Sequence, residues 1–478
     1  MPLFTFNFFG YKEIAQKYAI LAILVCVAYV AGYKLTESPP VWYDEGLYMQ
    51  SAMNWSERGE QGIQLAPQVF ASASNNTVGF PLMYPIKLSF DMFGVGVFQA
   101  RAVMVLFIVG LVACSFFFLQ ELFGRNFALY GAALLATFPV VYGNGKSILG
   151  EVPGMMFVIL FLFFLSKLEK NNFKGVELYV LAGLVGGLAI VTKPIYLLLL
   201  PALALPIFFL RKKISLEPRS LLLSVAAFFL PVVLWLFTQF DSSDSFVDII
   251  RFYATPSGIE NTVGLVLSNV ERFFTELSPL YVLMLSIVWA ASIFFRSSTI
   301  TLVEWVSFTF LALIMAAYMR TLGWYRYFFP AQVVSLLFLP IALRSLPYLK
   351  RYTPLILAAL IVFNAYQLLW NSFVAENYGS TKTAELQAYF GSYGADTSFF
   401  VYNAPEVVTF LPTRTYYQYL APRPTQVLGE DQLHVIQSGI PDEIIIHTDA
   451  YRDKAGEFAL YIVKDTLNRY TILAKKYD

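Results

Sequence analysis

Long apolar runs alternate with short polar segments along most of this chain. A helix that crosses the hydrocarbon core of a bilayer needs roughly 20 mostly apolar residues. Because proline tends to end the helix before it, we divide the apolar run at Lys193-Pro194 into two. The pattern predicts about eleven spanning helices, at residues 15–36, 97–120, 126–143, 152–168, 176–192, 195–210, 220–239, 279–295, 300–319, 327–344 and 353–370.

The composition excludes an ordinary soluble enzyme. Hydrophobic residues make up 58% of the 478 positions and charged residues only 14%, whereas a soluble protein carries roughly 25% charged residues. The formal net charge of +1 argues neither way about nucleic acid, but no basic tract is present, so we expect no nucleic-acid partner. The first apolar run, Tyr18–Tyr33, lacks a small-residue cleavage site behind it, and we expect it to remain as a helix.

Lysine and arginine in the short loops predict the orientation, because cytoplasmic loops carry an excess of both. If the N-terminus is cytoplasmic, the basic clusters Arg211-Lys212-Lys213 and Lys350-Arg351 fall on the cytoplasmic side. An odd number of spans then places the C-terminus outside. We therefore expect a multi-pass protein of the plasma membrane. The acidic residues expected in the outer loops are Asp44, Glu45, Glu57, Glu60, Glu151, Asp241, Asp244 and Asp248.

The predicted fold class is a polytopic α-helical membrane protein with a small C-terminal extracytoplasmic α/β domain. The membrane part covers residues 1–370. Its first outer loop, 37–96, contains an apolar run at Phe80–Phe93 that is typical of a helix lying on the membrane surface. The second long outer loop, 240–278, contains an amphipathic segment at Val263–Phe274.

Residues 371–478, which we call the tail, alternate helix-like with strand-like segments, and this predicts the α/β domain. The expected helices are Thr381–Phe390, Pro405–Phe410 and Asp431–Gln437, and the expected strands are Ser398–Asn403, Thr415–Leu420, Glu443–His447 and Tyr470–Ala474.

An acidic pair, Asp44-Glu45, follows the first apolar run. One interpretation is that both carboxylates are simply solvated beside an interfacial aromatic belt. However, Tyr48, Ala52 and Trp55 match the apolar face of a helix that starts near Asp44. The helix dipole keeps a carboxylate ionised at that position. Asp44 is therefore a candidate general base at the membrane surface.

Lys146 and Glu151 flank a tight outer turn between two predicted spans. One interpretation is an ion pair between them that closes the turn. A lysine on the outer side works against the charge bias of membrane proteins, however, and Glu151 together with Pro153 opens the next span. Ionisable residues beside spans mark function by default, so both are candidate site residues.

Three basic residues, Lys193, Arg320 and Arg326, lie at the outer ends of later spans. Snorkelling explains a lysine at a helix end, and aromatic-belt anchoring explains arginines beside Trp and Tyr. The alternative is binding of phosphate, by lysine as a point charge and by arginine through its bidentate guanidinium.

The cysteines and histidines do not have the sequence spacing of a metal-binding site. Cys26 and Cys114 lie inside apolar runs, so no disulfide is expected. His434 and His447 lie in the tail, apart from any cluster, and are interpreted as surface or structural residues. The Gly-x-x-x-Gly pattern at Gly183–Gly187 indicates close helix packing.

Taken in order, these motifs resemble the type C glycosyltransferases. Among them the chain is most similar to bacterial or archaeal members of the glycosyltransferase family 39 branch, which includes protein O-mannosyltransferases and the lipid A aminoarabinose transferase. The resemblance covers nearly the whole chain, although the lumenal β-trefoil of the eukaryotic mannosyltransferases has no counterpart here. The segments that carry it are Asp44-Glu45, Phe98–Ala102, Phe123–Arg125, the turn with Lys146 and Glu151, Thr192-Lys193-Pro194, and Arg326-Tyr327-x-x-Pro330.

This resemblance implies transfer of a sugar, with inversion, from a polyprenyl- or dolichyl-phosphate donor in the bilayer to an extracytoplasmic lipid, glycan or protein. A protein acceptor is the least expected of the three, because the β-trefoil is missing. No cofactor is implied beyond a divalent metal ion, which stays open, with Asp44 and Glu151 as its ligands if it binds. The implied roles are catalytic base for Asp44 with Glu45 beside it, acceptor organisation for Glu151, and donor-phosphate binding for Lys193 and Arg326, assisted by Lys146 or Arg320.

Two other functions remain open. The first is a transporter or flippase of a lipid-linked sugar, but transporters place ionisable residues near mid-bilayer and often show internal repeats, and the sequence shows no repeat. The second is a non-catalytic cell-envelope assembly protein whose tail binds a partner.

Overall fold

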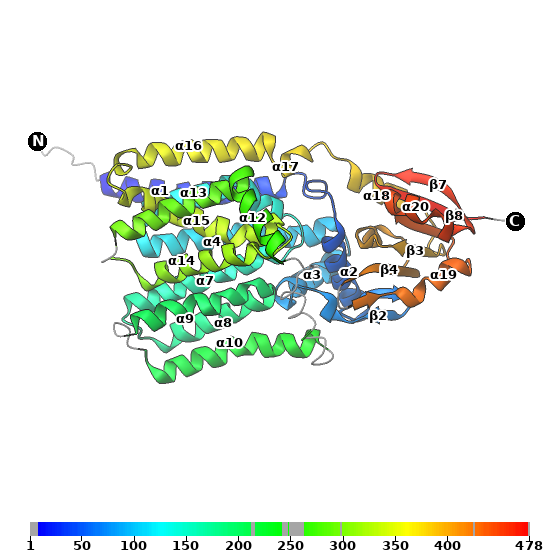
Figure 1. Cartoon of the computed structure of the whole chain (residues 1–478), viewed down its shortest axis with the longest axis horizontal. Coiled ribbons are helices and arrows are strands. Elements are labelled where there is room, and N and C mark those ends of the chain that lie inside the picture. Colours follow the sequence, from blue (N-terminus) through cyan, green and yellow to red (C-terminus); the bar gives the residue numbers. More distant parts are fainter. Residues whose placement is uncertain are drawn as a thin grey trace, which may run out of the picture.

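The computed structural model describes residues 8–211, 216–240, 247, 262–296, 299–423 and 426–476. Within these ranges, a bundle of long helices carries a mixed sheet at one end (Figure 1). The first helix starts at the end of the bundle that faces away from the sheet (Figure 1). Five residues used to predict the orientation lie outside the described ranges: Lys212, Lys213, Asp241, Asp244 and Asp248.

Every predicted apolar segment contains a helix. The corresponding elements are α1 (Phe8–Gly32), α4 (Val97–Phe123), α5 (Arg125–Thr137) with α6 (Pro139–Gly145), α7 (Glu151–Lys170), α8 (Val176–Thr192), the 3-10 helix η2 (Pro194–Leu198) with α9 (Leu199–Leu210), α10 (Pro218–Gln239), α13 (Leu277–Phe295), α14 (Leu302–Tyr318), α15 (Tyr325–Ser345), and α16 (Thr353–Tyr366) with the π-helix η5 (Gln367–Asn371). A short 3-10 helix, η4 (Lys350–Tyr352), precedes α16.

Fewer of these helices than eleven are long enough to span a bilayer. Among the described residues, six are long and apolar enough, and the pair α5–α6, bent by 59°, makes a seventh if it counts as one span. Four others are apolar but shorter: Tyr18–Gly32, Val176–Thr192, Pro194–Leu210 and Leu302–Tyr318. Eleven spans therefore stays a prediction.

The expected helix break at Lys193-Pro194 is confirmed. Lys193 has an extended backbone (φ −154°, ψ 121°) between α8 and η2, as the residue before a proline prefers. The close packing predicted from Gly183 and Gly187 is also confirmed. A Cβ at Gly183 would lie 2.0 Å from the Ser224 carbonyl oxygen, and one at Gly187 would lie 2.3 Å from that of Phe228. The backbones of α8 and α10 therefore lie in direct contact.

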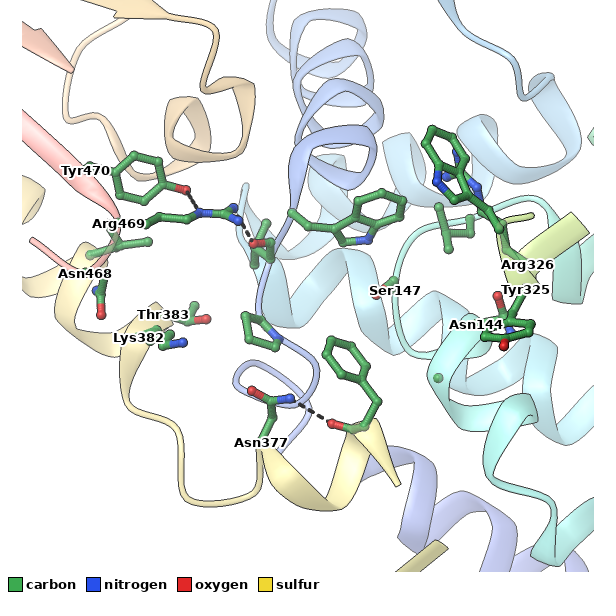
Figure 2. A pocket seen from close by; sticks show the side chains of 18 of the residues that line it. Asn144, Ser147, Tyr325, Arg326, Asn377, Lys382, Thr383, Asn468, Arg469 and Tyr470 are labelled. Atoms are coloured by element: carbon green, nitrogen blue, oxygen red, sulfur yellow. Dashed lines mark hydrogen bonds between the residues drawn. The ribbon is translucent and has the colours of Figure 1, made fainter. Parts of the chain in front are cut away.

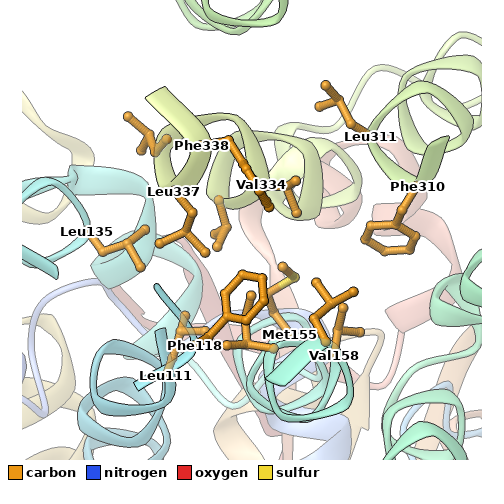
Figure 3. Packing of buried hydrophobic residues seen from close by; sticks show 14 of the residues in the cluster. Leu111, Phe118, Leu135, Met155, Val158, Phe310, Leu311, Val334, Leu337 and Phe338 are labelled. Carbon is orange, nitrogen blue, oxygen red and sulfur yellow. The ribbon is translucent and has the colours of Figure 1, made fainter. Parts of the chain in front are cut away.

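Large apolar side chains fill the centre of the bundle. Trp289 of α13 stacks on Phe338 of α15 with ring centroids 4.3 Å apart, and Phe118 of α4 meets the same ring edge-on. Figure 3 shows side chains of α4, α5, α7, α14 and α15 converging on this core. Stacked and edge-on aromatic pairs stabilise such contacts beyond the area they bury, so the helix ends that carry the charged residues are set on a rigid frame.

The predicted outer loops contain six described elements: α2 (Tyr43–Arg58), the hairpin β1 (Ile63–Ala66) and β2 (Val69–Ala71), the 3-10 helix η1 (Ala73–Asn75), α3 (Phe80–Phe93) and α12 (Thr262–Thr275). The helix expected at Phe80–Phe93 is thus confirmed, and the amphipathic segment Val263–Phe274 lies within the helix α12, whereas the hairpin was not predicted. On α3, Tyr84, Leu88 and Met92 are exposed at a spacing of four, which places them on one helix face.

The tail forms a six-stranded sheet in the order β5-β4-β3-β6-β8-β7, in which β3 runs parallel to β4 and β6 and the other pairs are antiparallel. Its elements are α17 (Phe373–Glu376), α18 (Lys382–Gly391), β3 (Phe399–Tyr402), η6 (Pro405–Phe410), β4 (Tyr416–Arg423), β5 (Gln426–Leu428), η7 (Glu430–Gln432), α19 (His434–Gln437), β6 (Glu443–His447), α20 (Thr448–Lys454), η8 (Ala455–Phe458), β7 (Tyr461–Leu467) and β8 (Tyr470–Lys475).

Most of the predicted tail elements are present, with two changes and five omissions among the described residues. The expected helix at Pro405–Phe410 is a 3-10 helix, and the one at Asp431–Gln437 divides into η7 and α19. The missed elements are the short helices α17, α20 and η8 and the two edge strands of the sheet, β5 and β7. All but the first and last residues of β7 are exposed, so its sequence lacks the alternation that a half-buried strand shows.

One face of the sheet shares a hydrophobic core with α2 and α3. Phe399 and Val401 of β3 belong to this core, whereas Phe400 and Tyr402 pack in a second core on the other face, because successive strand side chains point to opposite faces. The predicted domain boundary at residue 370 falls within η5, shortly before α17. The shared core crosses it and attaches the tail to the first outer loop.

Candidate active site

Helix α2 carries the acidic pair in its first turn. Trp42 precedes it in an extended conformation, Tyr43 begins it, and Asp44 and Glu45 follow. The predicted helix start near Asp44 is therefore confirmed, and Tyr48, one turn later, is buried as expected. Carboxylates in the first turn interact favourably with the helix dipole.

Asp44 forms an ion pair with Arg326, near the start of α15. The side chains are only 20% and 11% exposed. A cation at a helix N-terminus is unfavourable. The negative charge of Asp44 compensates for this unfavourable interaction of the Arg326 guanidinium with the dipole of α15. The guanidinium carbon also lies 5.1 Å from the ring centre of Trp42 and 4.6 Å from that of Trp324. These cation–π contacts fix the orientation of the guanidinium.

A second ion pair joins Glu151 and Lys193, with 3.5 Å between Oε1 and Nζ. Both side chains are buried, at 1% and 2% exposure. Glu151 is the first residue of α7 and Lys193 directly follows α8, so each charge matches the dipole at its helix end. Neither carboxylate oxygen of Glu151 has a hydrogen-bond partner among the described residues.

Tyr48 connects the two ion pairs. Its hydroxyl lies 2.6 Å from Thr77 Oγ1, which also accepts a long hydrogen bond of 3.4 Å from Lys193 Nζ. Burial raises the pKa of the Tyr48 hydroxyl; the charge of Lys193 opposes this shift and that of Asp44 adds to it. Because Tyr48 lies one helical turn after Asp44, the two pairs are neighbours. Asp44 with Arg326 and Glu151 with Lys193 thus form two neighbouring ion pairs.

A cavity of about 890 Å³ opens beside this cluster, between the bundle and the tail (Figure 2). Four cationic side chains lie on its wall, and the lining residues include no aspartate or glutamate. The wall is formed by Pro40, Val41, Trp42, Gly143, Asn144, Ser147, Leu149, Arg272, Gly323, Trp324, Tyr325, Arg326, Phe373, Asn377, Lys382, Thr383, Leu386, Asn468, Arg469 and Tyr470. Of the predicted site residues only Arg326 lies on the wall. Asp44 contacts Arg326 but is not a lining residue, and Glu151 and Lys193 are buried.

Glu45 has a different environment from Asp44. Its two carboxylate oxygens accept hydrogen bonds of 2.8 and 2.7 Å from Arg101, and both side chains are fully buried. Oε1 also accepts a 3.2 Å hydrogen bond from the backbone N–H of Ile148. Arg101 in turn donates to the carbonyls of Leu35 and Pro39. The Glu45 carboxylate therefore joins α2 to α4 and to the loop that precedes α7.

Lys146 and Arg320 lie away from the cavity wall. Lys146 donates a 2.6 Å hydrogen bond to the Tyr33 carbonyl, not to Glu151, and its side chain is fully buried. Burial, reinforced by the charge of Arg101, lowers the pKa of Lys146 to about 7. Arg320 is exposed at the end of α14. Neither residue is among those that line the cavity.

The sequence interpretation missed several cavity residues. Arg272 of α12 reaches the wall while bonded to Glu276 and to the Gly323 carbonyl; the amphipathic pattern of its segment was the available signal. Lys382 and Arg469 come from the tail, whose role the sequence did not reveal. His447 bonds to Glu406 and stacks near Tyr470, which fits the predicted structural role.

The residues present do not fit the metal site left open above. Asp44 and Glu151 each face a cation, and no third acidic or imidazole ligand joins them. Within the described ranges, no group of three or more His, Cys, Asp or Glu residues is placed to hold an ion.

Comparisons with known proteins identify similar sequences and similar folds. Residues 80–236, roughly a third of the chain, match the dolichyl-phosphate-mannose-protein mannosyltransferase family. The matched region contains Glu151 and Lys193 but neither Asp44 nor Arg326. No curated relative matches the sequence.

Solved structures show the same fold over the whole chain. ArnT from Cupriavidus metallidurans, bound to undecaprenyl phosphate, is similar with a TM-score of 0.68 at 14% identity, over 95% of this chain and 97% of that one. The archaeal oligosaccharyltransferase AglB from Archaeoglobus fulgidus, in complex with an inhibitory peptide and a dolichol-phosphate, has a TM-score of 0.57 at 13% identity, over 96% and 74%. The resemblance predicted from the motifs is thus confirmed: residues 80–236 match the mannosyltransferase family, and over 95% or more of its length the chain shares its fold with ArnT and AglB.

Proposed function

We propose that this protein transfers a sugar from a polyprenyl- or dolichyl-phosphate donor to an extracytoplasmic acceptor, with inversion at the anomeric carbon. The observation that carries the proposal is the contact between Asp44 and Arg326 beside a large cavity, with the Glu151–Lys193 pair next to it. ArnT and AglB, which share the fold, were solved with undecaprenyl phosphate and dolichol-phosphate.

In the proposed reaction Asp44 is the general base. Its carboxylate accepts the proton of an acceptor hydroxyl, and the hydroxyl oxygen attacks the anomeric carbon of the donor sugar. The bond from that carbon to the phosphate oxygen breaks, and the electron pair leaves with the lipid phosphate. Inversion follows because the attacking and leaving oxygens lie on opposite faces of the sugar.

The phosphate is expected to lie at the start of α15. Backbone N–H groups and the dipole make a helix N-terminus favourable for an anion, and Arg326 adds a guanidinium with several donors. Arg326 donates to Asp44 through Nη1 and, at 3.4 Å, to the Tyr327 hydroxyl through Nη2, and its side chain lies on the cavity wall. Lys193, behind Tyr48, adds a second positive charge. Cations placed where charge develops stabilise the transition state.

This proposal divides the predicted residues into two groups. Asp44, Glu151, Lys193 and Arg326 act in the reaction, with Glu151 holding Lys193 in place. Glu45, Lys146 and Arg320 do not contact substrate. We place the membrane part, residues 1–370, in the plasma membrane with its N-terminus in the cytoplasm, and the tail outside the cell.

The positions of the charges argue against a transporter or flippase. Glu151, Lys193 and Arg326 lie at helix ends, whereas transporters hold ionisable residues near mid-bilayer, in discontinuous helices. The two functions are separable by experiment, because a flippase moves the lipid across a vesicle membrane without forming a glycosidic product.

The test is transfer of radiolabel from a panel of polyprenyl-phosphate hexoses and pentoses to a membrane extract by the purified protein. Asp44→Asn should bind undecaprenyl phosphate and remain folded but lose about 10²- to 10⁴-fold in transfer rate, as expected when a general base is removed. Asp91→Asn is the matched control, because Asp91 is an acid of the same outer loop that pairs only with Lys87 and Ser56 on α3 and α2. Transfer by Asp44→Asn at the wild-type rate would rule out this base.

A further inference from the structure

The cavity has a second cationic end that the proposed donor site does not use. Figure 2 shows Lys382, Asn468 and Arg469 on one side and Asn144 and Arg326 on the other, with Ser147 between them. The first group belongs to the tail and the second to the bundle. A donor phosphate held at Arg326 leaves the tail side for the other substrate.

A tight turn brings Asn468 and Arg469 to this wall. Strands β7 and β8 pair from Leu467 to Tyr470, so these two residues form the hairpin loop. Asn468 has a positive φ of 55°, a conformation that asparagine tolerates better than most residues. The turn is therefore short and defined, and it projects Arg469 toward the cavity.

A buried carboxylate holds Arg469 in place. Glu406 is 1% exposed and accepts hydrogen bonds of 2.6 Å from Arg469 Nη2 and 2.7 Å from the Tyr470 hydroxyl. Arg469 Nε bonds to the Tyr470 hydroxyl as well. The Arg469 side chain remains 51% exposed, so its guanidinium is oriented from one side and accessible from the other.

Lys382 supplies a positive charge to the cavity wall. It is the first residue of α18, is exposed, and forms no ion pair among the described residues. The nearby carboxylate of Glu37 accepts hydrogen bonds of 3.0 Å from the backbone N–H groups of Thr383 and Ala384. Glu37 is buried and is not part of the cavity wall. Its carboxylate therefore binds the backbone N–H groups at the start of α18, and the Lys382 ammonium faces the cavity.

We propose that Lys382 and Arg469 form a binding subsite for an anionic group of the acceptor, a phosphate or a carboxylate. The assignment of this group to the acceptor rests on the proposed function, whereas the anion site itself does not. An ammonium and an oriented guanidinium are donors that favour an oxyanion through charge-assisted hydrogen bonds. Asn468 adds an amide that can donate or accept. A neutral acceptor would gain little from this arrangement.

The test measures anion binding with the donor end filled. The full-length protein is placed in phosphatidylcholine nanodiscs, saturated with undecaprenyl phosphate, and titrated by calorimetry with glycerol 1-phosphate and with galacturonate. Glycerol and galactose serve as the neutral counterparts. A lipid source is tested by competition, using nanodiscs that contain phosphatidate. Wild-type protein should bind at least one anion and neither neutral probe, and competition by phosphatidate would identify a lipid headgroup as the source.

Lys382→Ala should weaken binding of that anion by about tenfold or more, as expected for the loss of a hydrogen bond to a charged group. Lys454→Ala is the matched control, since Lys454 is another tail lysine that pairs with Glu457 away from the cavity. Arg469→Lys keeps the charge but loses the bidentate fork, and should also weaken binding. If Arg469→Lys disturbs the fold through Glu406, the exposed Lys382 decides the question alone.

Two outcomes would overturn the subsite: no anion bound by the wild-type protein, or equal affinities for Lys382→Ala and Lys454→Ala. Either result leaves the proposed function intact if undecaprenyl phosphate still binds and transfer still depends on Asp44. Conversely, anion binding that depends on Lys382, in a protein without transferase activity, would keep the site and reject the enzyme.

Discussion

Glu45→Gln should destabilise the fold, whereas Asp44→Asn should mainly affect turnover. The two acids are adjacent in sequence but have different partners. Glu45 and Arg101 form a bidentate pair at zero exposure, whereas Asp44 and Arg326 form a partly exposed ion pair through Nη1. A glutamine at position 45 keeps the size of the side chain but leaves the Arg101 charge buried without a counter-charge.

The magnitude follows from the burial of this pair. Removing one partner of a buried ion pair costs about 3–5 kcal/mol, because the remaining charge is uncompensated. The carbonyls of Leu35 and Pro39 continue to accept hydrogen bonds from Arg101, so we expect the lower part of this range. The double variant Glu45→Gln, Arg101→Met should recover part of the loss, since it removes the buried charge as well.

The free energy of unfolding is measured in mixed detergent micelles for the wild type, for the single variants Glu45→Gln and Asp44→Asn, and for the double variant Glu45→Gln, Arg101→Met. Transfer is measured on the same samples, normalised to folded protein. Asp44→Asn is the control, with a smaller loss of stability and a much larger loss of rate. The reasoning fails if Glu45→Gln is as stable as the wild type and loses transfer as completely as Asp44→Asn, because Glu45 would then act in the chemistry.

Two further predictions concern the contact between α2 and the tail. A Cβ at Gly46 would lie 2.3 Å from Glu406 Cα, so Gly46→Ala should lower the free energy of unfolding by about 1–3 kcal/mol and increase proteolysis around η6. Gly456→Ala is the control and should do neither, because a Cβ at Gly456 meets nothing within 4 Å. Equal behaviour of the two variants would contradict the contact. Burial disfavours the charge on Glu406, but hydrogen bonds from His447 and Tyr470 and the charge of Arg469 outweigh it, so the pKa of Glu406 lies below its ordinary value. The charged carboxylate therefore stabilises the tail fully above the unfolded-state pKa of about 4.3. This stability is lost as the pH falls through the lower folded-state pKa. The thermal unfolding temperature should therefore decrease from pH 6 to pH 3, and the decrease should be smaller in Glu406→Gln.

The sequence predicted those parts of the site that depend on local pattern. Asp44, Glu151, Lys193 and Arg326 were identified because a charge beside an apolar run is costly and therefore conspicuous. The start of α2, the break at Pro194 and the glycine contact of α8 with α10 follow from rules that act over a few residues. Each of these features is present in the structure.

The pairing of the charges could not be predicted in this way. Glu45 meets Arg101 across 56 residues, and Arg326 meets Asp44 across 282. The short turn at Lys146 suggested a pair with Glu151, yet burial directs Lys146 to the Tyr33 carbonyl and leaves Glu151 to Lys193. In a charge-poor chain each ion pair is selected by the packing of whole helices, about which residue spacing carries little information.

The contact of Gly46 with Glu406 explains why the cavity needs the tail. Gly46 directly follows the acidic pair, and its Cα faces the backbone of η6 without any side chain between them. From the same residue of η6, the Glu406 carboxylate extends to Arg469 on the opposite wall. One buried glutamate thus joins the helix of the proposed base to the residue proposed to hold the acceptor. A shift of η6 would move both α2 and Arg469. This coupling is a physical reason for the tail to share its hydrophobic core with α2 instead of being connected only by a flexible linker.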